Sequence, residues 1–380
     1  MNAKVLIFIF FLLFAKLSSQ IEIVESNYAS LYTDEQNKIY SLWKNYLKSW
    51  NNNKNEKCLF WKNDDYCDLL STEGFFNPSL YELGFSNQVI DISRIDNKSY
   101  NISSLFYWIG ENKDLNTMAI TNVIAERQAD NSFLLSNFLT NNGEKFLIYK
   151  QEDIIYHYPQ DFFFNKQNAK SAVIFLKKLR LLFNLPQKTV NYYIFKNCQD
   201  VFKNKGFYFA PGMSRNENCA FFDSHNNIIY TTQNYGEAHY HELIHSINEK
   251  YPNAHYLLLS GLAIYHNDDN VLFLNNYNDL FMSLNRYILH NNIKSIDIFN
   301  FPTFDSSITG DYMSGAILID VILQNGGIEL LKEALKEIKT DDDVNNFINK
   351  KLKLSSKEYN DLSLKKIKEM SNLDFKTKLF

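Results

Sequence analysis

The sequence predicts an α+β fold in two parts: a helix packed on an antiparallel sheet, followed by a mostly α-helical region. Two observations predict it. Aromatic and β-branched runs broken by turn residues, which are typical of strands, are concentrated before residue 160. Helical periodicity dominates after residue 232. The chain has 380 residues, of which 45% are hydrophobic. It is therefore long enough for two domains with sizeable cores.

The first domain is expected over residues 21–160. A helix is predicted from Thr33 to Trp50, because Thr33 and Gln36 have the spacing of a capping box and one apolar stripe follows. This stripe needs an apolar surface to cover, so we expect the helix to pack on a curved antiparallel sheet between Ser104 and Tyr158. The predicted strands lie in the runs Leu105 to Ile109, Thr117 to Ala125 and Phe133 to Leu139, with a turn at Asp130-Asn131-Ser132.

The second domain is expected over residues 161–380. It begins with an apolar helix from Gln167 to Phe183, which Asn184-Leu185-Pro186 should end. Strands are predicted at Val190 to Phe195 and at Ile228 to Thr232, with an irregular, cysteine-bounded segment between them. The rest of the domain is predicted to be mostly helical.

The first twenty residues, 1–20, are typical of a secretory signal peptide. Lys4 precedes an apolar run from Val5 to Ala15, and Ser18, Ser19 and Gln20 follow it. These eleven apolar residues are too few for a bilayer span, which needs about 20. We therefore expect an exported protein, in the periplasm, at the cell surface or secreted, cut near Ser19 or Gln20. An uncleaved anchor is the alternative.

Composition limits the partners of the mature chain. The 39 basic and 43 acidic residues give a net charge of -4, with no long run of either sign, so a nucleic-acid partner is not expected. No later stretch has the length and apolar character of a membrane span, so no transmembrane segment is expected in the mature chain. The sequence leaves the oligomeric state open.

The four cysteines fit an oxidising compartment, and they fall into two close pairs. Three pairings are possible. We predict the local bridges Cys58 to Cys67 and Cys198 to Cys219, because each would close one irregular segment. Neither pair has the short spacing that brings two thiolates to one zinc ion, so a zinc-thiolate site is not expected.

The most specific motif is His241-Glu242-Leu243-Ile244-His245, in a segment predicted to be helical from about Glu237 to Glu249. Residues four apart share one face of a helix, so the two imidazoles can converge on one Zn²⁺ ion. Glu242 is then placed to take a proton from a water that attacks a carbonyl carbon. Two surface histidines on an ordinary helix are the alternative reading.

Between about Lys188 and Glu369 the HELIH run is accompanied by three further motifs: Asn227-Ile228-Ile229-Tyr230, Leu259-Ser260-Gly261-Leu262-Ala263-Ile264-Tyr265, and the segment from Tyr312-Met313-Ser314-Gly315-Ala316 to Gly326-Gly327. In these motifs the chain resembles the gluzincin-type zinc peptidases of the peptidase MA clan, and among them the secreted bacterial peptidase MA-like proteins. The resemblance implies a gluzincin-like domain that hydrolyses peptides or proteins, with Tyr312 as a residue that stabilises an oxyanion. A buried tyrosine that serves only packing is the alternative for Tyr312.

The chain departs from this family at Ser260. The resemblance implies a glutamate there, as the third zinc ligand, and a neutral hydroxyl is a poor substitute for a carboxylate. Either another residue supplies the ligand or the site holds zinc weakly. The nearby candidates are His255, His266, Asp268 and Asp269. Tyr251 stands where a metzincin has a third histidine, and Glu249 is expected to be solvated or to lie behind the ligands.

Three functions remain open from the sequence. The first is zinc-dependent peptide hydrolysis by His241, His245, Glu242 and Tyr312. The second is a gluzincin-fold binding or regulatory protein without turnover. The third is ligand binding by the N-terminal domain, which loosely resembles the NTF2-like fold. His239, two residues before the motif, is expected to point away from the face of His241 and to lie at the surface or behind the metal ligands.

Overall fold

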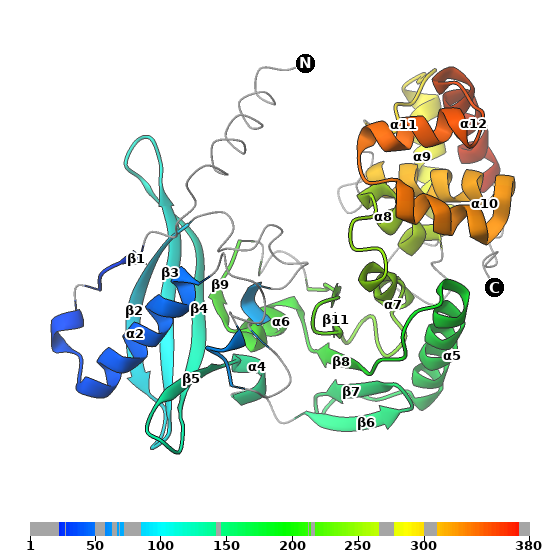
Figure 1. Cartoon of the computed structure of the whole chain (residues 1–380). Coiled ribbons are helices and arrows are strands. Elements are labelled where there is room, and N and C mark those ends of the chain that lie inside the picture. Colours follow the sequence, from blue (N-terminus) through cyan, green and yellow to red (C-terminus); the bar gives the residue numbers. More distant parts are fainter. Residues whose placement is uncertain are drawn as a thin grey trace. The chain divides into compact units, whose positions relative to one another are not determined.

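The computed structural model describes residues 23–26, 28–49, 58–62, 67, 69–71, 85–141, 146–211, 213, 217–265, 277–299 and 310–371 (Figure 1). The predicted signal peptide lies outside these residues. The chain divides into two compact units, residues 1–147 with 195–219, and residues 148–194 with 220–380. Two sheets and numerous helices confirm the α+β class.

The first unit is built on a mostly antiparallel sheet with the strand order β1-β2-β3-β4-β5, and β9 also pairs with β4. Helix α2, Asp34–Lys48, lies across this sheet in Figure 1 and buries Ile39, Trp43 and Leu47 completely. Thr33 and Gln36 form the predicted capping box. The strands are β1 Ile23–Val24, β2 Ser86–Arg94, β3 Ser99–Ile109, β4 Leu115–Arg127, β5 Phe133–Ser136 and β9 Phe207–Phe209, and the short helices are η1 Ala29–Leu31, η2 Leu69–Ser71, α4 Phe138–Asn141 and α6 Cys198–Lys205.

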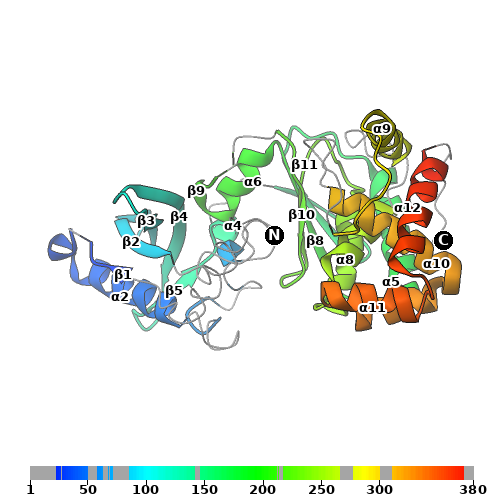
Figure 2. The same cartoon turned by 90° about the horizontal axis from the view of Figure 1, so that it is seen from above.

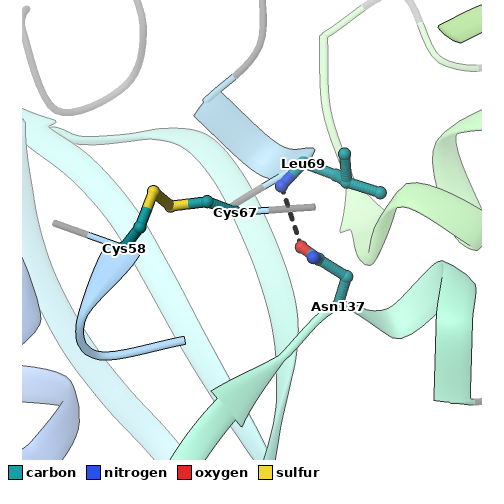
Figure 3. Close-up of a disulfide and its surroundings, with 4 residues drawn as sticks. All are labelled: Cys58, Cys67, Leu69 and Asn137. Atoms are coloured by element: carbon teal, nitrogen blue, oxygen red, sulfur yellow. Dashed lines mark hydrogen bonds between the residues drawn. A yellow bond between two sulfur atoms is a disulfide. The ribbon is translucent and has the colours of Figure 1, made fainter. Parts of the chain in front are cut away.

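Both predicted disulfides, Cys58–Cys67 and Cys198–Cys219, are formed. Figure 3 shows the first of them beside η2, where the backbone amide of Leu69 donates a 2.8 Å hydrogen bond to Asn137 Oδ1. This bond joins the cysteine segment to the residue that follows β5.

The segment between the second pair of cysteines belongs to the first unit, although we placed it in the second domain. Its strand β9 pairs with β4, and the amide of Asn122 donates to the carbonyl of Gly206. Gly206 has a φ of 103°, and a Cβ atom there would lie 2.5 Å from the carbonyl oxygen of Asn122. Only glycine allows the chain to approach β4 this closely.

The second unit begins with a sheet of strand order β10-β11-β8-β7-β6. Figure 1 labels β6, β7, β8 and β11 of this sheet, and Figure 2 labels β8, β10 and β11. The predicted strands β8, Val190–Phe195, and β11, Ile228–Thr232, are confirmed. Strands β6, Leu147–Gln151, and β7, Ile154–Tyr158, had been assigned to the first domain, with a boundary near 160. They belong to this sheet instead, since β7 pairs in parallel with β8. The remaining strand is β10, Phe221–Asp223.

Helices follow the sheet. Helix α5, Lys166–Phe183, ends at Asn184 in the left-handed conformation, as its sequence predicts. Helices α8 and α10 pack on each other, and α10 changes direction at Gly327, whose φ of 62° and ψ of -157° are not helical. The helices after the sheet are α7 Tyr240–Ile244, η3 His245–Glu249, α8 Tyr256–Tyr265, α9 Tyr277–His290, α10 Gly310–Glu337, α11 Asp341–Lys350 and α12 Ser356–Met370.

One described helical segment, Tyr312–Glu337 in α10, is long and apolar enough to cross a membrane. Of its most apolar window, 56% is buried inside the protein, and Met313, Ile317 and Leu318 lie in the core of the second unit. A core helix has this composition too, so the segment is weak evidence for a membrane span.

Candidate metal centre

The HELIH motif lies on a helix much shorter than predicted. We expected a helix from Glu237 to Glu249, but α7 covers only Tyr240–Ile244 and a 3₁₀ helix continues from His245. Glu237 is outside it because its carboxylate accepts hydrogen bonds from the backbone amide of Asn165, at 2.5 Å, and from Asn168 Nδ2, at 3.3 Å. Glu237 therefore holds the N-terminus of α5.

The structure brings the two predicted zinc ligands together. The ring centroids of His241 and His245 are 5.1 Å apart, with an interplanar angle of 70°. Two imidazoles bound tetrahedrally to one zinc at about 2.0 to 2.1 Å have ring centres roughly 5 Å apart. The Nδ1 atom of His241 is buried and has no hydrogen-bond partner among the described residues. The pair therefore fits two positions of a zinc site.

Burial keeps both rings neutral. It lowers the pKa of His241 well below its usual value, and the neighbouring His245 and His239 lower it further. Burial also lowers the pKa of His245 to about 4, against a hydrogen bond with Asn248 that raises it. Neutral imidazole is the form that binds a metal, so no proton has to be displaced at pH 7.

Glu242 lies on α7, between the two histidines in the sequence, and is buried, with 5% of its surface exposed. Burial raises the pKa of its carboxyl to about 8, while a hydrogen bond from the backbone amide of Phe222 in β10 lowers it. A bound cation would lower this pKa as well, because a nearby positive charge favours the carboxylate. Metal binding would therefore favour the ionised carboxylate of Glu242, which is the form that the predicted reaction requires.

Tyr312, which is predicted to stabilise an oxyanion, lies close to His241. Its ring centroid is 6.4 Å from that of His241. Tyr312 is in the first turn of α10 and is half-buried. The structure thus brings together the rings of His241, His245 and Tyr312, with Glu242 on the same short helix as His241. The role of Tyr312 remains a prediction.

No described residue supplies a third ligand. Ser260 is half-buried in α8. The Nε2 atom of His255 pairs with Asp341 at 2.9 Å, and Glu249 pairs with Lys188. Among the described ranges, no three His, Cys, Asp or Glu residues are grouped so that they could hold a metal ion. The remaining candidates, His266, Asp268 and Asp269, lie outside the described residues.

Two features of the site were not predicted from the sequence. His239 was expected to point away from His241, but its ring is buried and stacks near that of His241, with centroids 5.9 Å apart. The reason is that His239 is the N-cap of α7, with a non-helical ψ of 85°, so helical spacing does not apply to it. The hydrogen bond from the Phe222 amide was also missed, because nothing in the sequence pairs β10 with α7. No family model and no curated protein matches this chain.

Proposed function

We propose that this protein is an exported zinc-dependent metallopeptidase that hydrolyses peptide bonds. The observation that carries the proposal is the pair of neutral imidazoles, His241 and His245, whose rings are 5.1 Å apart, in a segment that also carries the buried Glu242. Two disulfides are compatible with export. The substrate would be a peptide or protein.

His241 and His245 would hold the zinc through ring nitrogens. Zinc, when bound, supplies a Lewis acid that lowers the pKa of water and polarises a carbonyl. Glu242 accepts the proton that water releases as it attacks the carbonyl carbon, and returns this proton to the leaving nitrogen. The hydroxyl of Tyr312 donates a hydrogen bond to the oxygen on which negative charge develops.

A direct test combines metal content with Glu242→Gln. Protein purified without chelator should contain about one zinc and cleave an unstructured protein substrate. Glu242→Gln should keep the zinc and lose activity by about 10² or more, since it removes the base but neither imidazole. Glu249→Gln is a matched control, because Glu249 pairs with Lys188 at the surface. Equal activity in the parent and in Glu242→Gln would reject the proposal.

A second function is favoured by Ser260 and by the lack of a third ligand among the described residues. In this alternative the protein keeps the site but holds zinc weakly, and it acts as a binding or regulatory module without turnover. It predicts that the parent and Glu242→Gln are equally inactive at saturating zinc. The same pair of proteins therefore separates the two functions.

A further inference from the structure

His239 is a buried imidazole that the proposed reaction does not use. Only 3% of its surface is exposed. Neither ring nitrogen, Nδ1 or Nε2, has a hydrogen-bond partner among the described residues. Buried polar atoms are nearly always hydrogen-bonded, and an exception in a site often marks a group with a role in it. His239 is therefore a candidate for a further role in this site.

The place of this ring is fixed by contacts that leave both nitrogens available. The backbone amide of His239 donates to the hydroxyl of Tyr192 at 3.1 Å, and this hydroxyl donates to the carbonyl of Gly236 at 2.9 Å. The imidazole stacks on Tyr235, with centroids 4.3 Å apart and an interplanar angle of 17°. Strand β8 and the Tyr235 ring together hold His239 beside α7.

The carboxyl of Glu242 lies close to the ring of His239. The distance from His239 Nδ1 to Glu242 Oε1 is 4.0 Å. This is longer than a hydrogen bond, so a bond between them requires rotation about the side-chain bonds. The amide of Phe222 also donates to the carboxyl of Glu242. The carboxyl therefore accepts one N–H from β10 and has the imidazole at the N-cap of α7 as a further neighbour.

We propose that His239 is a positioning residue for Glu242, whose Nδ1–H donates to Oε1 and fixes the direction in which the carboxylate meets the attacking water. The inference rests on the proposed function. Charge-assisted hydrogen bonds to a carboxylate are short and directional, so they restrict its rotation. Among the described residues, no three His, Cys, Asp or Glu side chains are grouped so that they could hold a metal ion. This disfavours His239 as a third metal ligand.

The contact is tested first without any activity, by a double-mutant cycle on the unfolding free energy of the metal-free protein at pH 9, where the carboxyl of Glu242, with a pKa of about 8, is ionised. His239→Phe keeps the stack on Tyr235 and removes the donor, and Glu242→Leu removes the acceptor. Each single change leaves one buried group without its partner, while the double change removes both. The two effects should therefore be non-additive, with the double variant less destabilised than their sum. Additive effects would overturn the proposal.

The second test measures orientation. His239→Phe should lower kcat about tenfold, with KM and zinc affinity as in the parent, because only the direction of the base changes. His239→Asn, whose amide can donate from the same position, should recover part of the loss. An unchanged kcat in His239→Phe, or no recovery in His239→Asn, contradicts the proposal. If His239→Phe binds zinc more weakly than the parent, the positioning role is contradicted and His239 acts as a metal ligand.

If the parent and Glu242→Gln are equally inactive, the proposed function fails. The double-mutant cycle still decides in that case whether His239 and Glu242 interact.

Discussion

Gly261 in α8 and Gly315 in α10 are in backbone contact. A Cβ atom built on Gly261 would lie 2.2 Å from the carbonyl carbon of Gly315, and one built on Gly315 would lie 2.1 Å from the carbonyl oxygen of Leu257. Both obstacles are backbone atoms, which cannot rotate away. The two helices therefore approach as closely as they do only because neither residue has a side chain. Tyr312 is one turn before Gly315 on the same helix.

Gly315→Ala is expected to destabilise the protein by about 1 to 3 kcal/mol, because the added methyl forces α8 and α10 apart. The free energy of unfolding from urea denaturation measures it. Gly110→Ala is the control, since its Cβ would meet the Asn116 side-chain amide at 3.0 Å. That side chain can move, so we expect a change within about 0.5 kcal/mol. Equal effects of the two changes would contradict the interpretation.

The elements that the sequence predicts well are those with local signals. Helix α2 begins after Thr33 because its capping box with Gln36 is complete within four residues. Helix α5 ends where Asn184 adopts a left-handed conformation that asparagine tolerates. Strands β8 and β11 have the predicted bounds, because continuous runs of apolar and aromatic residues mark buried strands.

The errors arise where the partner of a segment is distant in sequence. Alternation in β7 predicts a strand but not that it pairs with β8. The extent of α7 depends on Glu237, which is held at the N-terminus of α5, and the placement of His239 depends on Tyr192. The motif thus predicted the pair His241 and His245, while the buried surroundings of Glu242 required the three-dimensional structure.

Removing the Cys198–Cys219 bridge is expected to lower the free energy of unfolding by about 3 kcal/mol, because the oxidised loop restricts the unfolded chain. The double change Cys198→Ala, Cys219→Ala measures it in urea. The cysteines of this bridge are 21 residues apart, whereas Cys58 and Cys67 are 9 apart. The double change Cys58→Ala, Cys67→Ala should therefore lower the free energy of unfolding by slightly less. Unchanged stability in both variants would contradict the expectation.

Ser260→Glu is expected to raise zinc affinity at least tenfold, or about 1.4 kcal/mol, if this residue of α8 occupies the position of the missing ligand. An anionic oxygen would complete a shell of two imidazoles and one carboxylate. Competition with a chromophoric chelator measures the affinity. Ser260→Gln has the same shape without the charge, and it should stay near the parent. If Ser260→Glu binds zinc no more tightly than Ser260→Gln, the third ligand lies elsewhere.

The metal-free protein is expected to be most stable near pH 6.5. Burial lowers the pKa of His239 to about 3 and that of His245 to about 4, against about 6.5 in an unfolded chain. Between pH 4 and 6.5 the unfolded chain therefore binds protons that the folded protein excludes. The free energy of unfolding consequently rises with pH over this range.

Glu242 acts in the opposite direction. Its folded pKa is raised to about 8, whereas an unfolded glutamate has a pKa of about 4.3. From pH 4.3 to 8 the folded protein binds a proton that the unfolded chain has lost, so this group lowers stability as the pH rises. Below about pH 6.5 the buried histidines, which include His241, together outweigh Glu242, and above this pH the effect of Glu242 becomes the larger one. Stability should therefore decline from pH 6.5 to 8 in urea denaturation of the chelator-treated parent, and Glu242→Gln should abolish this decline. A decline of the same size in Glu242→Gln would show that another group titrates in this range and that the carboxyl of Glu242 is already ionised in the folded protein.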